Sequence, residues 1–280
     1  MNIDLSNYHD ETNSISKTML SHFHASPCEF NRYYVAKLQR PPQPKAAIVG
    51  AIAHAVLLEG KQLGDIACLY PSDCLKSNGA INPKPARLWE QSLNPDQYAV
   101  KADVYAQCDA LLAGIASHQV VGLVADAHAR EERVDCLDEQ SGLRCRCRPD
   151  FLYDMGDEVI CYDLKFTTQV KPREFWRVAR MFRYWMQDAH YSRTIEAASG
   201  KPCKFVFWAV EDTPPYRIAR YEYTAESREN ARAEVAATLR DLASRYETGD
   251  WSDSWTTGTN DLLFTSTEST SLELDWSGIE

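Results

Sequence analysis

The chain has 280 residues, of which 44% are hydrophobic, and a formal net charge of −10. This length and composition suffice for one substantial hydrophobic core, and nothing indicates a second complete domain. No apolar run reaches the length of a membrane span, residues 1–10 are polar and acidic rather than signal-like, and nine scattered cysteines argue against a disulfide framework, so we expect an intracellular protein.

The first helix signals lie in the N-terminal fifth of the chain. A capping box at residues 26–29 starts a short helix, and three prolines mark a linker over 37–45. Residues 46–58 are apolar on every side except at His54, which predicts a buried helix that ends before Gly60. A buried imidazole needs a partner, so His54 is either a hydrogen-bonded core residue or a metal ligand.

The middle of the chain changes from helical to strand patterns. Residues 82–118 fit two helices. After them, residues 127–137 and 143–153 predict a hairpin, and residues 158–162 predict a buried strand. We therefore expect an α/β fold, with a central mixed sheet flanked by helices.

Charged residues follow the ends of these predicted strands. Asp150 ends the hairpin, and Asp163 and Lys165 share one face of the next strand because side chains alternate. Two carboxylates and the free carbonyl of Leu164 suit a hard cation such as Mg²⁺, with room for a phosphate and an attacking water. Lys165 would then orient or deprotonate that water. Taken alone, an Asp-x-Lys pattern is more often a solvated surface pair.

A basic stripe follows the lysine. Pro172 marks a helix start, and arginines recur after it at steps of four, three and three, at Arg173, Arg177, Arg180 and Arg183. The stripe is either a solvated face or a contact for DNA phosphates. Gln187 and Tyr191 share a neighbouring face of the same continuing helix, which should end at Gly200.

The last part of the chain separates a domain from a tail. Strands over 203–210 and 216–223 and a closing helix complete a single predicted domain, residues 1–249. The tail, residues 250–280, is acidic and rich in Ser and Thr, and it is either a flexible end or a segment that docks on another surface. Eight acidic and no basic residues lie in 246–280, so the preceding residues carry 30 basic and 32 acidic groups, a balance that permits a basic channel.

Together, these motifs resemble a known family. The chain resembles the PD-(D/E)xK nucleases of the RecB type in an ordered set of motifs: Gly50-x-x-x-His54-x-x-x-x-Glu59, Arg148-Pro149-Asp150, Asp163-x-Lys165 and Gln187-x-x-x-Tyr191. The N-terminal run of Tyr8-His9, Ile15-Ser16-Lys17 and Ser26-Pro27 narrows this to the nuclease domain of the RecE, or exonuclease VIII, family of phages and prophages. The resemblance covers roughly residues 6–210, and the order of the motifs makes it specific.

The resemblance implies a restriction-endonuclease-like core and a reaction. Members of this family digest double-stranded DNA from 5′ to 3′ with Mg²⁺, leaving 3′ single-stranded tails for recombination by annealing. The implied metal ligands, for two Mg²⁺ ions that Mn²⁺ can replace, are His54, Asp150, Asp163 and the Leu164 carbonyl. The implied catalytic residues are Lys165 on the nucleophilic water, Gln187 and Tyr191 as positioning groups, Asp150, Asp163, and an acidic residue before them, for which we favour Glu131 over Glu132.

The resemblance also implies partners. The expected DNA contacts are Ser16, Lys17 and Arg32 at a 5′-terminal phosphate, with Arg148, Arg173, Arg177 and Arg180 elsewhere. We expect duplex DNA ends, a single-strand annealing protein, a homo-oligomeric ring, most simply a tetramer, and the cytoplasm of a bacterial host cell, without a membrane. Some related nucleases hold an iron–sulfur cluster with three cysteines after the Gln-Tyr helix. Cys203 is the only cysteine beyond Tyr191, so we expect no such cluster.

Two alternatives remain from the sequence. One is a RecB-type nuclease of other polarity or with a preference for single strands. The other is a non-catalytic scaffold that binds DNA ends in recombination, although the presence of His54, Asp150, Asp163 and Lys165 disfavours it.

Overall fold

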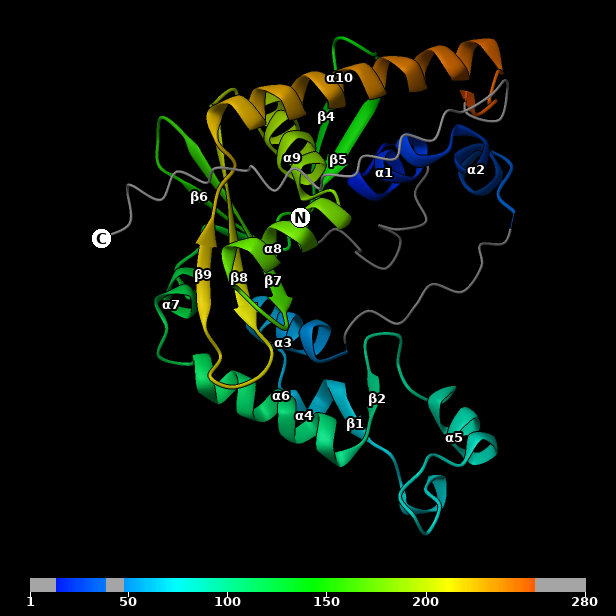
Figure 1. Cartoon of the computed structure of the whole chain (residues 1–280), viewed down its shortest axis with the longest axis vertical. Coiled ribbons are helices and arrows are strands. Elements are labelled where there is room, and N and C mark those ends of the chain that lie inside the picture. Colours follow the sequence, from blue (N-terminus) through cyan, green and yellow to red (C-terminus); the bar gives the residue numbers. More distant parts are fainter. Residues whose placement is uncertain (1–13, 39–47, 255–280) are drawn as a thin grey trace, which may run out of the picture.

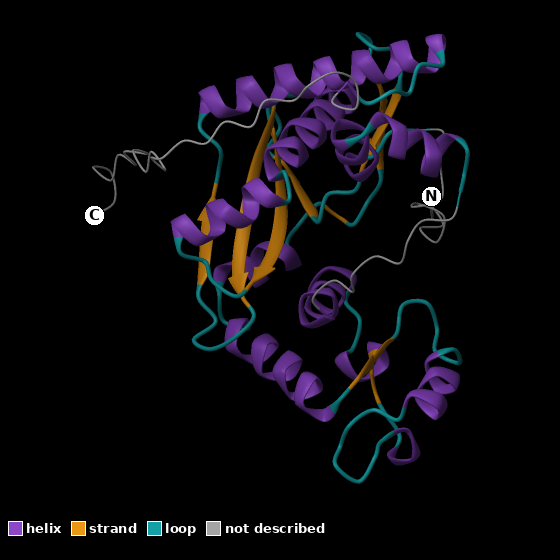
Figure 2. Cartoon of the chain, turned by 45° about the vertical axis from the view of Figure 1, so that its right-hand side comes forward, coloured by secondary structure: helices purple, strands orange, loops and turns teal. Residues whose placement is uncertain are grey.

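In the computed structural model, the described residues are 14–38 and 48–254 (Figure 1). They form a central sheet with helices on both faces, and an arm that extends from one end of this body (Figures 1 and 2). The predicted α/β class, with a mixed sheet flanked by helices, is confirmed. No single helix of the described residues is long and apolar enough to cross a membrane, and one pair bent by 92° meets that test only jointly.

The central sheet is built around two long parallel strands. Its order is β3-β6-β7-β8-β9, with the bounds β3 Ala129–Arg130, β6 Phe151–Asp154, β7 Val159–Thr167, β8 Cys203–Glu211 and β9 Ile218–Tyr221. Strands β7 and β8 pair in parallel along all nine residues of each, whereas β6 and β9 are antiparallel to their neighbours. Parallel strands require a crossover, which here consists of α8 (Pro172–Met181) and α9 (Tyr184–Ser199).

Side-chain alternation assigns the two faces of the sheet. Odd-numbered residues of β7, including Asp163 and Lys165, share the face that α8 and α9 cover. The core on this face contains Cys161, Phe205 and Phe207 from the strands, with Phe175 of α8 and Ile195 of α9. On the other face, α7 (Gln119–Ala125) packs through Val120 and Val124 against Leu164, Val206 and Trp208.

Along the chain, the arm is inserted between two helices, and these helices pack together against the end of the sheet. Helix α3 (Ile48–Glu59) and helix α6 (Ala102–Ile115) share a core with Val210 of β8. Between them the arm contains α4 (Leu63–Ile66), the parallel strands β1 (Ala67–Leu69) and β2 (Tyr98–Val100), a 3-10 turn (Ser72–Cys74) and α5 (Pro83–Glu90). The two helices predicted over 82–118 are α5 and α6, and β2 separates them.

The N-terminal helices pack against the last helix. Helix α1 (Lys17–Ala25), α2 (Pro27–Phe30) and a π-helical turn (Asn31–Val35) share a core with α10 (Ala225–Thr248). The first residues of the predicted tail join this core, because Trp251 stacks on Phe30 at a ring distance of 5.8 Å. Asp253 is buried and accepts a hydrogen bond of 2.8 Å from the Ser26 hydroxyl. Residues 255–280, the rest of the predicted tail, lie outside the described residues.

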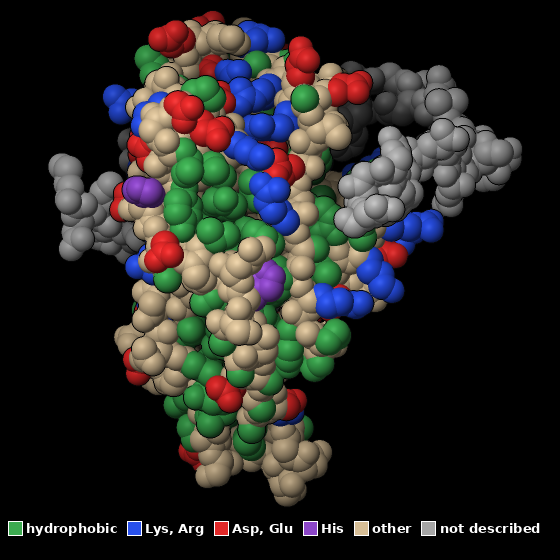
Figure 3. Space-filling model, turned by 90° about the vertical axis from the view of Figure 1, so that its left-hand side faces the viewer, with side chains coloured by type: hydrophobic (Ala, Val, Ile, Leu, Met, Phe, Trp, Pro, Cys, Tyr) green, Lys and Arg blue, Asp and Glu red, His purple; other side chains and the backbone are tan. Residues whose placement is uncertain are grey.

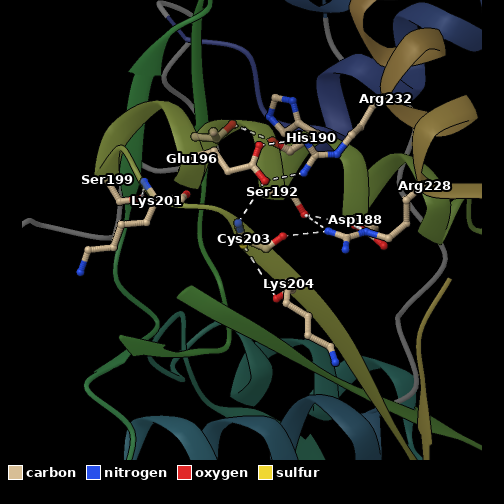
Figure 4. A network of polar contacts seen from close by, with 11 residues as sticks. Asp188, His190, Ser192, Glu196, Ser199, Lys201, Cys203, Lys204, Arg228 and Arg232 are labelled. Atoms are coloured by element: carbon tan, nitrogen blue, oxygen red, sulfur yellow. Dashed lines mark hydrogen bonds and ion pairs between the residues drawn. The ribbon is translucent and has the colours of Figure 1, made fainter. Parts of the chain in front are cut away.

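A polar network joins α9 to α10 and β8 (Figure 4). Arg232 forms two hydrogen bonds with the Glu196 carboxylate, at 2.6 and 2.8 Å. Arg228 donates to the Cys203 carbonyl at 2.8 Å and lies 3.4 Å from the buried Asp188. We call this group the α9–α10 tie; its members are Asp188, Ser192, Glu196, Cys203, Arg228 and Arg232.

One sequence expectation about these elements was wrong. The predicted continuous helix after Pro172 breaks into α8 and α9 at Arg183, whose φ of +51° is left-handed and cannot continue a helix. The predicted hairpin of residues 127–137 and 143–153 is confirmed, because β4 (Val134–Leu137) pairs antiparallel with β5 (Arg144–Cys147), and β3 pairs with β6 in the same register. The ladder is interrupted at Glu131, whose φ is +52°, so β4 and β5 form a separate two-stranded sheet.

Candidate active site

Four separate parts of the chain converge at the edge of β7. Helix α3 carries His54, the turn after β3 carries Glu131, and the turn between β5 and β6 carries Asp150. Asp150 therefore precedes a strand of the central sheet, rather than ending one. Strand β7 brings Asp163 and Lys165 into the same group, and α9 brings Gln187. We call these six side chains the active-site cluster.

A glycine sets how closely α3 approaches the sheet. A Cβ at Gly50 would come within 2.9 Å of the Phe166 Cβ on β7. Only glycine therefore allows this contact between α3 and β7. His54 lies one helical turn after Gly50, so the close contact also fixes the distance from the imidazole to the carboxylates.

The imidazole lies between two carboxylates. His54 Nε2 is 3.1 Å from Asp150 Oδ1 and 3.4 Å from Glu131 Oε1. One ligand atom from each of these three residues lies within 4.8 Å of the others, which is the spacing of a metal site. The side chain of His54 is 28% exposed, so this face of α3 opens to the cavity described below instead of being buried.

The second half of the active-site cluster is tied together by hydrogen bonds. Lys165 forms an ion pair with Asp163, and Gln187 Nε2 donates to the other Asp163 oxygen. The Leu164 N–H donates to Asp150. Since the N–H and C=O of one strand residue point to the same edge, the Leu164 carbonyl faces the side on which Asp150 and His54 lie.

Burial and charge shift these groups in different directions. Burial and the charge of Asp150 raise the pKa of Glu131 to about 7. Burial also raises the pKa of Asp163, and Lys165 only partly offsets this effect. Burial alone would raise the pKa of Asp150, but the neighbouring His54 holds the pKa of Asp150 below its usual value. Burial alone would lower the pKa of His54, yet the carboxylates, chiefly Asp150, raise it to about 9.

A cavity of about 270 Å³ gives access to the cluster. Besides the cluster, it is lined by Ser16, Lys17 and Thr18 at the start of α1, by Arg148, and by Tyr191 of α9. Arg148 Nε lies 2.9 Å from Glu131 Oε2. Lys17 donates to the Phe182 carbonyl at 2.9 Å, and burial together with the charge of Lys165 lowers the pKa of Lys17 to about 8.

Comparison with known proteins agrees with this geometry. The family model of the PDDEXK-like domain of unknown function (DUF3799) matches residues 16–259. The chain belongs to this PDDEXK-like family. The predicted membership of the PD-(D/E)xK nuclease superfamily is therefore confirmed. No curated protein matches the sequence.

One solved structure shares the fold of this chain. A structure from Eubacterium rectale, named "Putative exonuclease", matches with a TM-score of 0.59 and 13% identity over 89% of this chain and 88% of its own. At that identity, the likeness concerns the fold alone. A second structure, named SSO0001, has 15% identity over 72% of this chain and 86% of its own, but its TM-score of 0.29 carries no argument.

The donor set fits the divalent metal expected for a PDDEXK-like domain. Both carboxylate oxygens of Glu131 and Oδ1 of Asp163 are buried, and they face the nitrogen atoms of His54, Arg148 and Lys165. Imidazole, carboxylate and carbonyl groups at this spacing could hold a divalent cation. His54, Glu131 and Asp150 already lie at ligand spacing, and Asp163 with the Leu164 carbonyl adjoins them.

The structure brings together some of the predicted site residues and not others. All the predicted catalytic and metal-binding residues lie in or beside the cavity, as do Ser16, Lys17 and Arg148. The other predicted DNA contacts are exposed and do not line it: Arg32 on the π-helical turn, and Arg173, Arg177 and Arg180 on α8. Thr18 and Tyr184 adjoin the active-site cluster, but the sequence analysis did not predict them as site residues. Tyr184 lies one helical turn before Gln187, and its ring centre is 4.9 Å from the Lys165 ammonium.

Proposed function

We propose that this protein is a divalent-metal-dependent nuclease that removes nucleotides from the ends of double-stranded DNA, from 5′ to 3′, leaving 3′ single-stranded tails. The observation that supports it most is the clustering of His54, Glu131 and Asp150 within ligand distance, beside the Asp163–Lys165 pair in one cavity. The Eubacterium rectale structure, which is named an exonuclease, supports the choice of this reaction. Polarity and the role in recombination by annealing rest on the RecE resemblance.

Each residue of the active-site cluster has a chemical role in this proposal. A bound cation, Mg²⁺ with Mn²⁺ as a substitute and two ions at full occupancy, would polarise the scissile phosphate and activate water. His54, Asp150, Asp163 and the Leu164 carbonyl would hold it, with Glu131 as a further ligand. Asp163 raises the pKa of Lys165 well above its ordinary value, so Lys165 stays an ammonium. It therefore orients the nucleophilic water and balances phosphate charge instead of removing a proton.

The other groups around the cavity would position DNA. Gln187 holds Asp163 by its hydrogen bond, and Tyr191 lines the path of the strand being cut. Ser16 and Lys17 adjoin the cavity where a 5′-terminal phosphate would enter. If they bind that phosphate, a duplex with 5′-phosphate ends will be digested faster than one with 5′-hydroxyl ends.

The deciding experiment uses linear duplex labelled at either the 5′ or the 3′ end, with Mg²⁺. We expect early release of mononucleotides from the 5′ label, no reaction in EDTA, and no cutting of closed circular duplex. Early release of the 3′ label would establish the opposite polarity, and faster digestion of denatured DNA would establish a single-strand nuclease. Binding of ends without cleavage at any metal concentration would favour the scaffold.

Partners are also part of the proposal. A 3′ tail needs a protein that anneals it, and an exonuclease that stays on one strand gains from a ring around the duplex, most simply a tetramer. Mass measurement in solution, with and without linear duplex, tests the ring. A monomer under both conditions would contradict it without affecting the proposed chemistry.

A further inference from the structure

Helix α8 presents an exposed face that the proposed chemistry does not use. Arg173, Trp176, Arg177 and Arg180 recur at the spacing of one helical face. The opposite side of α8 is buried through Phe175 and Ala179. Three guanidinium groups and a large aromatic ring therefore point away from the core. Trp176 is 44% exposed, although a ring of this size is generally buried.

Two more apolar side chains are exposed where α8 ends. Met181 is 72% exposed and Phe182 is 55% exposed, and both precede the break at Arg183. We call Trp176, Met181 and Phe182 the α8 ridge. Its neighbours carry positive charge, since Arg180 lies 5.5 Å over the Trp176 ring. Glu174 on the same helix forms an ion pair with Arg177, with an N···O distance of 3.1 Å.

The ridge reaches the active-site cavity through Phe182. The Phe182 carbonyl accepts the hydrogen bond from Lys17, which lines the cavity. The Phe182 ring stacks on Tyr184 at 6.2 Å, and the Tyr184 ring lies 4.9 Å from the Lys165 ammonium. An unbroken series of contacts therefore runs from the exposed Phe182 ring to the Asp163–Lys165 pair. In Figure 1, α8 lies alongside β7 and β8, with its C-terminal end directed toward α9.

Exposed rings interleaved with arginines favour one kind of ligand. A folded protein partner would cover the apolar side chains, but it would also have to neutralise Arg173 and Arg180, whereas Arg177 is already paired with Glu174. A nucleic-acid strand with unpaired bases offers both complements at once, because every base has a π face and every linkage carries a negative charge. Paired bases inside a duplex are already stacked on one another, so a strand with unpaired bases offers the ridge more free base faces.

We propose that the α8 ridge, with its flanking arginines, binds an unpaired nucleic-acid strand at the mouth of the active-site cavity, with Phe182 and Trp176 stacking on its bases. This inference rests on the proposed nuclease function and adds a specificity element to it. The strand is either the frayed end of the duplex being cut or a free single strand. Both offer the same chemistry.

The test measures equilibrium binding with Ca²⁺ in place of Mg²⁺, so that binding is read without cleavage. Three probes are used: a short single strand, a blunt duplex, and the same duplex with a mismatched end. The double variant Trp176→Ala with Phe182→Ala should bind the single strand and the mismatched end about 100-fold more weakly, about tenfold for each stacked base. Binding of the blunt duplex should change by less than about threefold.

Matched variants separate stacking from loss of structure. Phe182→Trp keeps a ring and should retain binding, whereas Phe182→Leu keeps apolar bulk and should lose it. Met155→Ala removes a side chain that is 56% exposed after β6 and should change nothing. The hydrogen bond from Lys17 uses the Phe182 backbone, so it survives these changes.

The outcomes are distinct. Unchanged single-strand affinity in the double variant, or an equal loss on all three probes, overturns the role of the ridge while leaving the nuclease intact. Mismatched-end binding that falls together with single-strand binding assigns the ridge to fraying ends, and a loss confined to the single strand assigns it to a free strand. If the unaltered protein digests no DNA and binds none of the probes, the proposed function itself fails.

Discussion

Two polar clusters meet on helix α9, and they differ in how their charged groups are arranged. Helix α9 directs Gln187 toward the active-site cluster and the next residue, Asp188, toward the α9–α10 tie. In the tie, arginines of α10 face carboxylates of α9, and Arg232 donates two hydrogen bonds to Glu196 (Figure 4). The tie lines neither the active-site cavity nor any described opening to it. It holds α10 against α9 and β8.

The active-site cluster places carboxylates beside one another. Burial and the charge of Asp150 raise the pKa of Glu131 and of Asp163, although His54, Arg148 and Lys165 lie against these carboxylates. The same cluster opens to a cavity. The difference shows how buried charge can be read for function: carboxylates that face arginines in a closed network stabilise the fold, whereas carboxylates crowded together at a cavity are retained for a ligand.

Removing the lysine of the active-site cluster should have the largest effect. Lys165→Ala deletes the ammonium that orients water and balances phosphate charge, so we expect cleavage to fall by about 10³-fold or more. Unfolding on heating should remain cooperative. Lys201→Ala, which breaks the surface pair with Asp154, is the matched control and should leave the rate unchanged. Equal activity of Lys165→Ala and the unaltered protein would remove this residue from the reaction.

Breaking the α9–α10 tie should lower stability and leave cleavage nearly unchanged. Arg228→Ala leaves the buried Asp188 without its cation, which should lower the free energy of unfolding by about 3 kcal/mol. Cleavage per folded molecule should stay within about twofold. The surface arginine Arg220, paired with Glu222, supplies the control, because its loss should cost less than about 1 kcal/mol. A large loss of cleavage at full folding would show that the two clusters are coupled through α9.

The smallest expected effect is a pH-dependent change in the free energy of unfolding, caused by Glu131 of the active-site cluster. The pKa of Glu131 is raised from 4.5 when unfolded to about 7 when folded, so the folded protein holds an extra proton between these values. The contribution of Glu131 to the free energy of unfolding is therefore most favourable below pH 4.5, and it is lost as the pH rises through 7. In metal-free protein, Glu131→Gln should therefore be more stable above pH 7, on the order of 1 kcal/mol, while cleaving poorly.

Denaturant unfolding in EDTA between pH 5 and pH 8 measures this difference. Glu132→Gln is the control, because Glu132 is exposed and should show no pH-dependent gain. A Glu131→Gln protein that loses stability at pH 8 would place Glu131 among the matched charges, as in the tie.

Local sequence patterns predicted much of the fold. The apolar run before Gly60 forms α3, whose last residue is Glu59, and Gly60 has the left-handed φ of +67° expected after a helix end. Strand β7 carries Asp163 and Lys165 on one face, as alternation requires. These features depend on neighbours in the chain, so their signals are present in short windows.

Features that depend on distant contacts could not be predicted in this way. The break at Arg183 carries no glycine or proline, and its helical periodicity continues across it, so only packing shows it. The positive φ of Glu131 turns its carboxylate toward His54, and no local pattern marks an acidic residue for that conformation. The basic stripe likewise gave the correct face of α8 but not its distance from the cavity.

The contact between Asp253 and Ser26 has a consequence for how the protein is made. Ser26 ends α1, the helix whose first residues line the cavity, and its hydroxyl is held by Asp253. Trp251 and α10 cover the same N-terminal helices. During synthesis the ribosome releases residues 14–38 first, and their contacts with β5 and α9 can form before residues 225–254 emerge. Residues 225–254 then complete the packing of α1, so this wall of the active site reaches its full stability only after every residue of the active-site cluster has been made.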